Sequence, residues 1–192
     1  MTRSSLTAAL SVLLLTGASA FTQTSTWTID TNQTQIDFQI RHVPVSNVRG
    51  LFSRITGTLN WDEKNPSKCS VQVTIPTSSI STANDRRGAD LRSPEFFDVK
   101  KYPTMTFRST SVTGTPGKLQ ITGDLTLLGV TRSVTLAVDG PTVPSKELGA
   151  KLVIGFSATG IVKRSDFNFA PKFSTVILGD EIKFTIDLEA DK

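Results

Sequence analysis

Side chains able to do acid–base or nucleophilic chemistry are scarce in this chain. Its 192 residues include one histidine, His42, and one cysteine, Cys69. General acid–base catalysis usually relies on histidine or on paired carboxylates, and a hydrolase serine often sits in a Gly-x-Ser-x-Gly turn. The sequence has no such turn. It therefore predicts no catalytic residues and a protein that is not an enzyme.

Metal and phosphate chemistry find no better support. A zinc site takes three or four histidine, cysteine or carboxylate ligands at recognisable spacing, whereas His42 and Cys69 stand 27 positions apart. Glycine-rich phosphate loops need a Gly-x-Gly-x-x-Gly or a Walker pattern, and neither occurs. We expect no metal and no cofactor, and we interpret Cys69 as a small buried hydrophobic residue.

The charged residues do not form a surface suited to nucleic acid. The chain has 21 Lys and Arg residues against 17 Asp and Glu residues, and the basic ones form at most short pairs such as Arg86-Arg87 and Lys100-Lys101. Binding to a phosphate backbone requires a clustered basic stripe. We therefore exclude nucleic acid as a partner.

The first twenty residues are typical of an export signal. Arg3 precedes an apolar stretch over residues 6–15, and small residues at 17–20 suit cleavage after Ala20. The alternative, a membrane anchor, is disfavoured because this stretch is too short to cross about 30 Å of hydrocarbon as a helix. We predict a signal peptide at 1–20, a single exported domain at 21–192, and a periplasmic or secreted protein.

The elements that must position any site are strands. Ile36, Phe38 and Ile40 alternate with polar residues, which places one apolar face on a strand. The same alternation recurs near residues 55–61, 71–75, 105–107, 119–127, 134–138, 152–158 and 182–188. Glycine- and proline-containing turns separate these segments and favour antiparallel hairpins. The pattern predicts an all-β protein of about eight strands.

One segment departs from the alternation. Residues 83–97 suit one or two short helical turns, with Ser93 as a helix N-cap followed by Pro94 and Glu95. The strands could close into a barrel or pack as a two-sheet sandwich. Alternation does not choose between them, and we prefer the barrel. An eight-stranded barrel is just wide enough for side chains or one small ligand.

Several motifs resemble the signature of the YceI-like family. They occupy residues 93–109, 123–136 and 164–167, and Trp27-Thr28-Ile29-Asp30 and residues 38–42 also fit, so that the resemblance runs from about 27 to 189. It implies a lipocalin-like, antiparallel up-and-down barrel exported to the bacterial periplasm. It also implies binding of a long-chain polyisoprenoid lipid, such as an isoprenoid quinone or polyprenyl derivative, and no catalysis.

The chain departs from the family pattern at three places. Gln33 replaces a frequent histidine, Asp90 stands in Arg87-Gly88-Ala89-Asp90-Leu91 where the family often reads Arg-Asp-x-His-Leu, and Asn168 replaces a glycine. Polar recognition that depends on those histidines is therefore not expected here.

Two groups of residues are predicted to contact the lipid. The apolar lining should come from one alternating face: Phe38, Ile40, Leu59, Val73, Ile75, Phe107, Leu125, Leu127, Leu136, Ile154, Phe156 and Phe184. Polar contacts to a head group are predicted for Arg41, His42, Arg87, Asp90 and Arg92. A slip of one residue in register would turn every such side chain to the other face.

Three functional hypotheses follow. The first is storage, protection or transport of a polyisoprenoid lipid in the barrel, without a transmembrane anchor and with only transient contact to a membrane. The second is an enzyme that uses Arg41, His42 or Asp90 on a lipid head group. The third is a stress-related interaction protein whose barrel is closed and filled by its own side chains. The family resemblance also allows a homodimer, which no sequence feature indicates.

Overall fold

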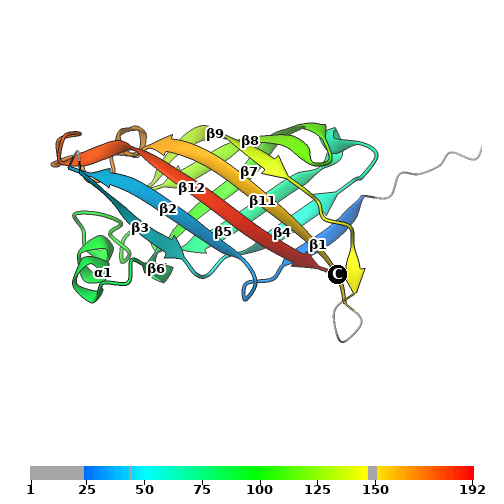
Figure 1. Cartoon of the computed structure of the whole chain (residues 1–192), viewed down its shortest axis with the longest axis horizontal. Helices are drawn as coiled ribbons and strands as arrows, with labels where there is room; N and C mark the ends of the chain where they lie inside the picture. Colours follow the sequence, from blue (N-terminus) through cyan, green and yellow to red (C-terminus); the bar gives the residue numbers. More distant parts are fainter. Residues whose placement is uncertain (1–23, 44, 147–150) are drawn as a thin grey trace, which may run out of the picture.

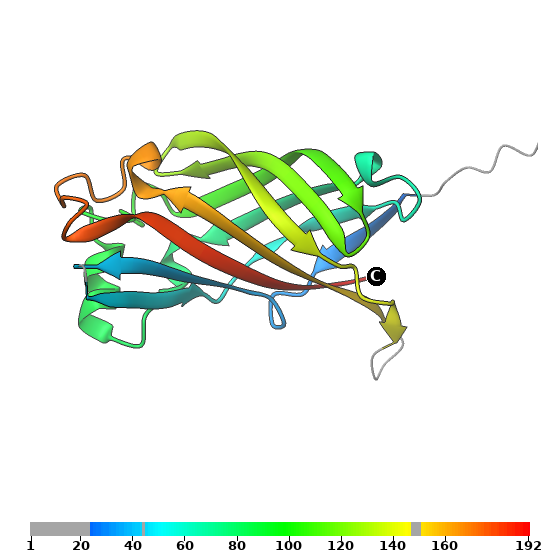
Figure 2. The same ribbon diagram turned by 45° about the horizontal axis from the view of Figure 1, so that its top comes forward.

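A computed structural model describes residues 24–43, 45–146 and 151–192 (Figures 1 and 2). The predicted signal peptide lies outside these residues, so its prediction stays open. Within the described ranges the regular structure is mainly β-strand, with one α-helix and three short 3-10 helices. None of the helices in the described ranges is long and apolar enough to cross a membrane.

The bounds of the elements are as follows. The strands are β1 (Ser25–Ile29), β2 (Gln35–His42), β3 (Ser46–Phe52), β4 (Thr56–Trp61), β5 (Ser70–Pro76), β6 (Ile80–Ser81), β7 (Thr104–Thr115), β8 (Lys118–Leu127), β9 (Val130–Asp139), β10 (Ser145–Lys146), β11 (Leu152–Lys163) and β12 (Leu178–Asp191). The helices are η1 (Pro66–Lys68), η2 (Thr77–Ser79), α1 (Asp85–Arg92) and η3 (Arg164–Phe167).

The long strands form a closed ring. β1 and β2 form one interrupted strand of this ring, β3 and β4 form a second, and β5 and β6 form a third. β4 pairs antiparallel with β1 on one side and with β5 on the other, and β3 likewise pairs with β2 and with β6. Three such interrupted strands and the single strands β7, β8, β9, β11 and β12 make eight in the described residues. β12 closes the ring by pairing with β1 and β2. Each strand pairs with its neighbours along the chain, which confirms the predicted up-and-down barrel.

The hairpins follow from local chemistry. Leu128 and Gly129 both have positive φ, at 52° and 74°, in the two-residue turn that joins β8 to β9. Such turns match the right-handed twist of the flanking strands, and glycine adopts this backbone conformation without strain. The sequence pattern therefore specifies both the position of this reversal and the register of the pair.

The helical prediction for residues 83–97 is confirmed, but its cap is not. α1 begins after Asn84, whose side-chain oxygen accepts a hydrogen bond from Arg87 N at 2.9 Å. Ser93 ends this helix instead of starting one, and its hydroxyl accepts from Glu95 N at 3.3 Å. Both residues are good caps; Asn84 takes the role because the chain turns into the helix directly after β6.

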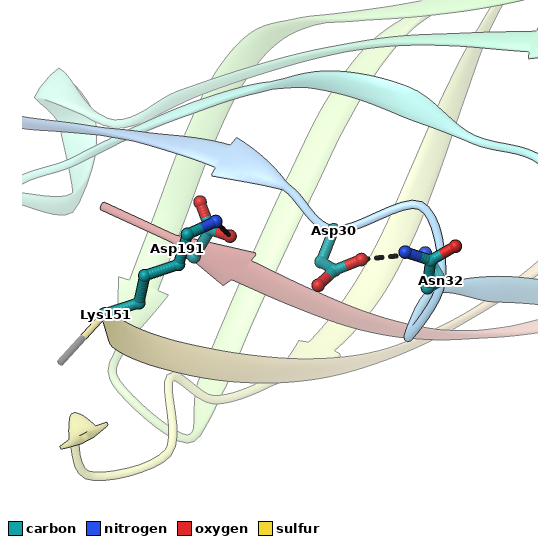
Figure 3. Close-up of polar contacts among 4 residues, drawn as sticks. All are labelled: Asp30, Asn32, Lys151 and Asp191. Atoms are coloured by element: carbon teal, nitrogen blue, oxygen red, sulfur yellow. Dashed lines mark hydrogen bonds and ion pairs between the residues drawn. The ribbon is translucent and has the colours of Figure 1, made fainter. Parts of the chain in front are cut away.

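The pairing around the ring is uneven. β11 and β12 share a continuous ladder from Val153↔Asp191 to Lys163↔Glu181, whereas the described ladder between β9 and β11 covers only residues 137–139 and 157–159. At the start of β11, Lys151 Nζ lies 2.7 Å from Asp191 Oδ2 and ties that strand to the end of β12 (Figure 3). The same view shows Asp30 accepting from Asn32 N at 2.8 Å, in the turn between β1 and β2.

Candidate functional site

The barrel encloses a cavity of about 380 Å³. All eight strands of the ring contribute side chains to its wall, because alternate residues of each strand face inward. The strands β2, β8 and β12 contribute the most lining residues, and apolar side chains also come from α1 and from the connections before β7 and β12. Aliphatic and aromatic members include Ile36, Phe38, Ile40, Leu59, Val71, Val73, Phe107, Val112, Ile121, Leu125, Leu127, Leu136, Phe156, Ala158, Val162, Ile182, Phe184, Ile186 and Leu188.

Most of the predicted apolar lining faces this cavity. Phe38, Ile40, Leu59, Val73, Phe107, Leu125, Leu127, Leu136, Phe156 and Phe184 are all on its wall. Ile75 and Ile154 are not on this wall. They are 4% and 1% exposed, packed within the solid part of the core. Their inward face was predicted correctly, but alternation does not tell where along a strand the interior is empty.

Polar groups gather at one end of the cavity. His42 at the end of β2 and Arg87 and Asp90 on α1 belong to the lining, and their predicted contact with a head group stays a prediction. Arg87 Nε donates to Thr82 Oγ1 at 3.0 Å, which fixes its guanidinium beside the rim. Away from this end, the side chains that the described residues place on the wall are apolar or aromatic apart from Cys69 and Ser70. The site can therefore bury an apolar molecule, with polar contacts confined to the rim and the opposite end.

Two predicted head-group contacts lie elsewhere. Arg41 is next to His42 on β2 and so faces the outside, where its Nη1 lies 3.5 Å from Asn47 Oδ1. Arg92 donates from Nη2 to the Ile80 carbonyl at 2.7 Å. Arg92 thus fastens the end of α1 to β6. Neither residue is on the wall of the cavity.

A cluster of aromatic rings covers the same end of the barrel. Phe97 lies between Phe52 and Phe169, with ring centroids 5.6 and 4.7 Å away, and Phe96 is 5.5 Å from Phe173. Phe96 and Phe97 were not predicted as lining, because they follow α1 outside the strand alternation. Their adjacent apolar pair within residues 93–109 was the only signal that could have identified them.

Arg164 organises the connection between β11 and β12. This side chain is 3% exposed, yet its nitrogens donate to the backbone carbonyls of Phe169, Ala170, Phe173, Leu178 and Gly179 at 2.6–3.2 Å. Burial of a charge is costly unless hydrogen bonds replace its hydration. The fan of carbonyls does so, and it holds Phe169 and Phe173 against the cavity.

Cys69 lies at the opposite end of the cavity, beside Trp61. Burial raises the pKa of the Cys69 thiol above its ordinary value, and a hydrogen bond from Asp62 N to Sγ, at 3.2 Å, opposes that shift. A thiol with a raised pKa is a poor nucleophile at neutral pH. Among the described residues, moreover, no three histidine, cysteine or carboxylate side chains form a group that could hold a metal.

Comparisons with known proteins agree with this geometry. A family model described as the YceI-like domain matches residues 27–190. The protein YceI of Salmonella newport is 40% identical over 154 residues, covering 80% of this chain and 79% of that protein.

Solved structures show the same architecture. The YceI protein of Campylobacter jejuni superposes with a TM-score of 0.71 at 35% identity, over 79% of this chain and 89% of that one. A polyisoprenoid binding domain from Saccharophagus degradans superposes with a TM-score of 0.64 at 14% identity, over 86% and 97%. At 14% identity, the likeness to this domain shows the fold alone.

Proposed function

This chain belongs to the YceI-like family, and from that premise we propose that its barrel holds a long-chain polyisoprenoid lipid for storage, protection or transport. An isoprenoid quinone or a polyprenyl derivative is the expected class of ligand. The protein acts by binding and carries out no reaction on its ligand.

The apolar cavity is the observation that carries this proposal. Its volume of about 380 Å³ lies within the range of small-molecule sites, about 300–1,000 Å³. Hydrocarbon walls favour a hydrocarbon ligand through the hydrophobic effect, which needs no directional contacts. At about 0.3 kcal/mol per heavy atom, every ten prenyl carbons that the cavity buries could supply about 3 kcal/mol, roughly a hundredfold in affinity.

The name of one structural neighbour supports the choice of ligand. The Saccharophagus degradans domain is described as polyisoprenoid binding, and it shares this barrel. We propose the same class of ligand, a polyisoprenoid, for this chain because the cavity wall is apolar and is built from all the strands of the barrel. The arrangement of His42, Arg87 and Asp90 at the rim suits a polar head group at the entrance.

Export fits the same role. Residues 1–20 have the charge, apolar stretch and small residues of a signal peptide. In the periplasm or outside the cell, a lipid moving between membranes must cross water, and a hollow barrel would shield it. N-terminal sequencing of the protein recovered from its native compartment would test for a mature chain beginning after Ala20.

Transient contact with a lipid bilayer is supported by the rim of the cavity. Val45, Val176 and Ile177 are 81%, 68% and 47% exposed, although each is aliphatic. Val43 N donates to the Ile177 carbonyl at 2.8 Å, which joins the β2–β3 turn to the segment before β12. Ile177 also lines the cavity, so that the exposed apolar rim is continuous with the interior.

Native mass spectrometry of the mature protein, purified from its own envelope, tests the proposal directly. A stoichiometric excess mass, identified as a prenyl lipid after organic extraction, is the expected result. A bare protein mass that stays unchanged after incubation with quinones of several chain lengths would overturn it, in favour of a closed-barrel interaction protein.

A further inference from the structure

Three phenylalanine rings on the cavity wall lie over glycines in neighbouring strands. Phe38 on β2 is paired with Gly50 on β3, and Phe184 on β12 is paired with Gly160 on β11. Phe38 and Phe184 are also paired with each other. The row therefore reads glycine, phenylalanine, phenylalanine, glycine across four adjacent strands.

A third pair lies in another part of the ring. A Cβ placed on Gly123 of β8 would come within 3.0 Å of Phe107 Cζ, and Phe107 belongs to β7. Gly123 has Ile121 and Leu125 on either side of it in the same alternation, and both line the cavity. The glycine therefore faces inward, beneath the ring.

The rings occupy the space that the missing side chains leave. A Cβ on Gly50 would lie 2.6 Å from Phe38 Cζ, and one on Gly160 would come within 3.0 Å of Phe184 Cζ. Real Cβ atoms essentially never approach so closely. Because the backbone of the wall lies behind each ring, a ring displaced by a Cβ has to turn toward the empty interior.

From these contacts we infer that the three glycines set the bore of the cavity and so decide the cross-section of the chain that it admits. The inference rests on the proposed lipid-binding function. An isoprenoid carries a methyl branch on every repeat and is wider than an unbranched alkyl chain. Rings that lie flat over glycine leave room for those branches, whereas rings that stand away from the wall would pass only a thinner chain.

Gly160 is the best position for a test. Its added Cβ would meet only side-chain atoms of Phe184 and Leu136, whereas at Gly50 and Gly123 it would also meet backbone oxygens. Gly155 on the same strand provides the control, because a Cβ there would have its nearest contact at 3.4 Å, with Thr142 Cγ2. Gly160→Ala should therefore move a ring without breaking the sheet.

The experiment compares two probes, a tetraprenyl alcohol and an unbranched alcohol with the same number of carbons, by displacement of a fluorescent apolar dye. Gly160→Ala is expected to weaken the tetraprenyl alcohol about tenfold more than the unbranched one, the scale of one misfitted methyl group in an apolar pocket. Gly155→Ala should leave both affinities unchanged. Equal losses for the two probes, or none, would overturn the inference.

Removal of the ring provides the second arm, and its single variant, Phe184→Leu, does not depend on the folding of Gly160→Ala. Phe184→Leu widens the bore and should bind the tetraprenyl alcohol at least as tightly as the natural chain. Combined with Gly160→Ala, it should restore the preference for the branched probe. If the unsubstituted protein binds neither probe, the proposed function fails; if it binds both and these variants do not alter the ratio, only the role of the glycines fails.

Discussion

Arg164 Nη2 donates to the Phe173 carbonyl oxygen at 2.6 Å, and through this contact a buried cation holds an aromatic wall of the cavity in place. Phe173 lies in the segment between η3 and β12, which has no strand partner of its own at that point. The order of the entrance therefore depends on a side chain that does not itself line the cavity.

Replacement of Arg164 should destabilise the barrel. Arg164→Met keeps much of the side-chain volume but leaves the carbonyls of residues 169–179 without their donor, and we expect a loss of about 3 kcal/mol in the free energy of unfolding. Urea denaturation measures it. Arg108→Met is the control, because Arg108 is exposed on the outer face of β7, and it should change stability little. An equal effect of the two changes would contradict this role for Arg164.

Truncation of Phe97 should remove the centre of the aromatic cluster. Phe97 is 7% exposed and packs against Phe52 and Phe169, so that Phe97→Ala is expected to cost about 3–5 kcal/mol. Phe96→Ala, at a half-buried neighbour, should cost clearly less. Thermal or urea unfolding measures the free energy of unfolding of the two variants. Similar losses of stability in both would mean that the cluster is not organised around Phe97.

A longer side chain at Ala158 should block ligand binding. Ala158 lines the cavity on β11, so Ala158→Leu places additional carbons where the prenyl chain is proposed to lie. We expect at least about a tenfold loss in quinone affinity, with Thr159→Leu on the outer face of the same strand as control. Unchanged affinity in a folded Ala158→Leu protein would place the ligand outside the barrel.

Polar substitution of the rim should slow the uptake of lipid from membranes. Val45→Ser together with Val176→Ser removes exposed apolar surface near the entrance, and should reduce the rate at which quinone is extracted from phosphatidylcholine vesicles by about tenfold. Val143→Ser is the control, since Val143 is 87% exposed but lies in the connection between β9 and β10, at the other end of the barrel. Binding of quinone presented in detergent should stay the same in all variants.

Cys69 should make stability fall at alkaline pH. Folding raises the pKa of its thiol above the ordinary 9.0, so the unfolded chain releases this proton first as the pH rises. The contribution of the protonated Cys69 thiol to the free energy of unfolding is complete below pH 9.0. It is lost as the pH rises through the pKa of the thiol in the folded state. Above pH 9.0, the free energy of unfolding should therefore decline less steeply in Cys69→Ala than in the unsubstituted protein. Parallel curves for the two proteins would show that Cys69 does not contribute.

The sequence by itself determined most of the long strands and the faces that they bury, although β1 and β3 were not predicted from the alternation. Period-two alternation identified the apolar face of β2 through Phe38 and Ile40, and the motif at residues 93–109 indicated the family. Such local signals are reliable because each side chain's direction follows directly from its position along a strand.

Only the tertiary structure decided how those faces enclose space. Alternation is the same in a sandwich and a barrel; the pairing of β12 with β2 closes the ring, between residues that are far apart in the sequence. Alternation also could not distinguish Ile154, which is packed in the solid core, from Phe156, which faces the cavity. Nor could it show that Arg164 would be buried among carbonyls. The period fixes the direction of a side chain, whereas the volume in front of it is set by strands that fold against it from elsewhere in the chain.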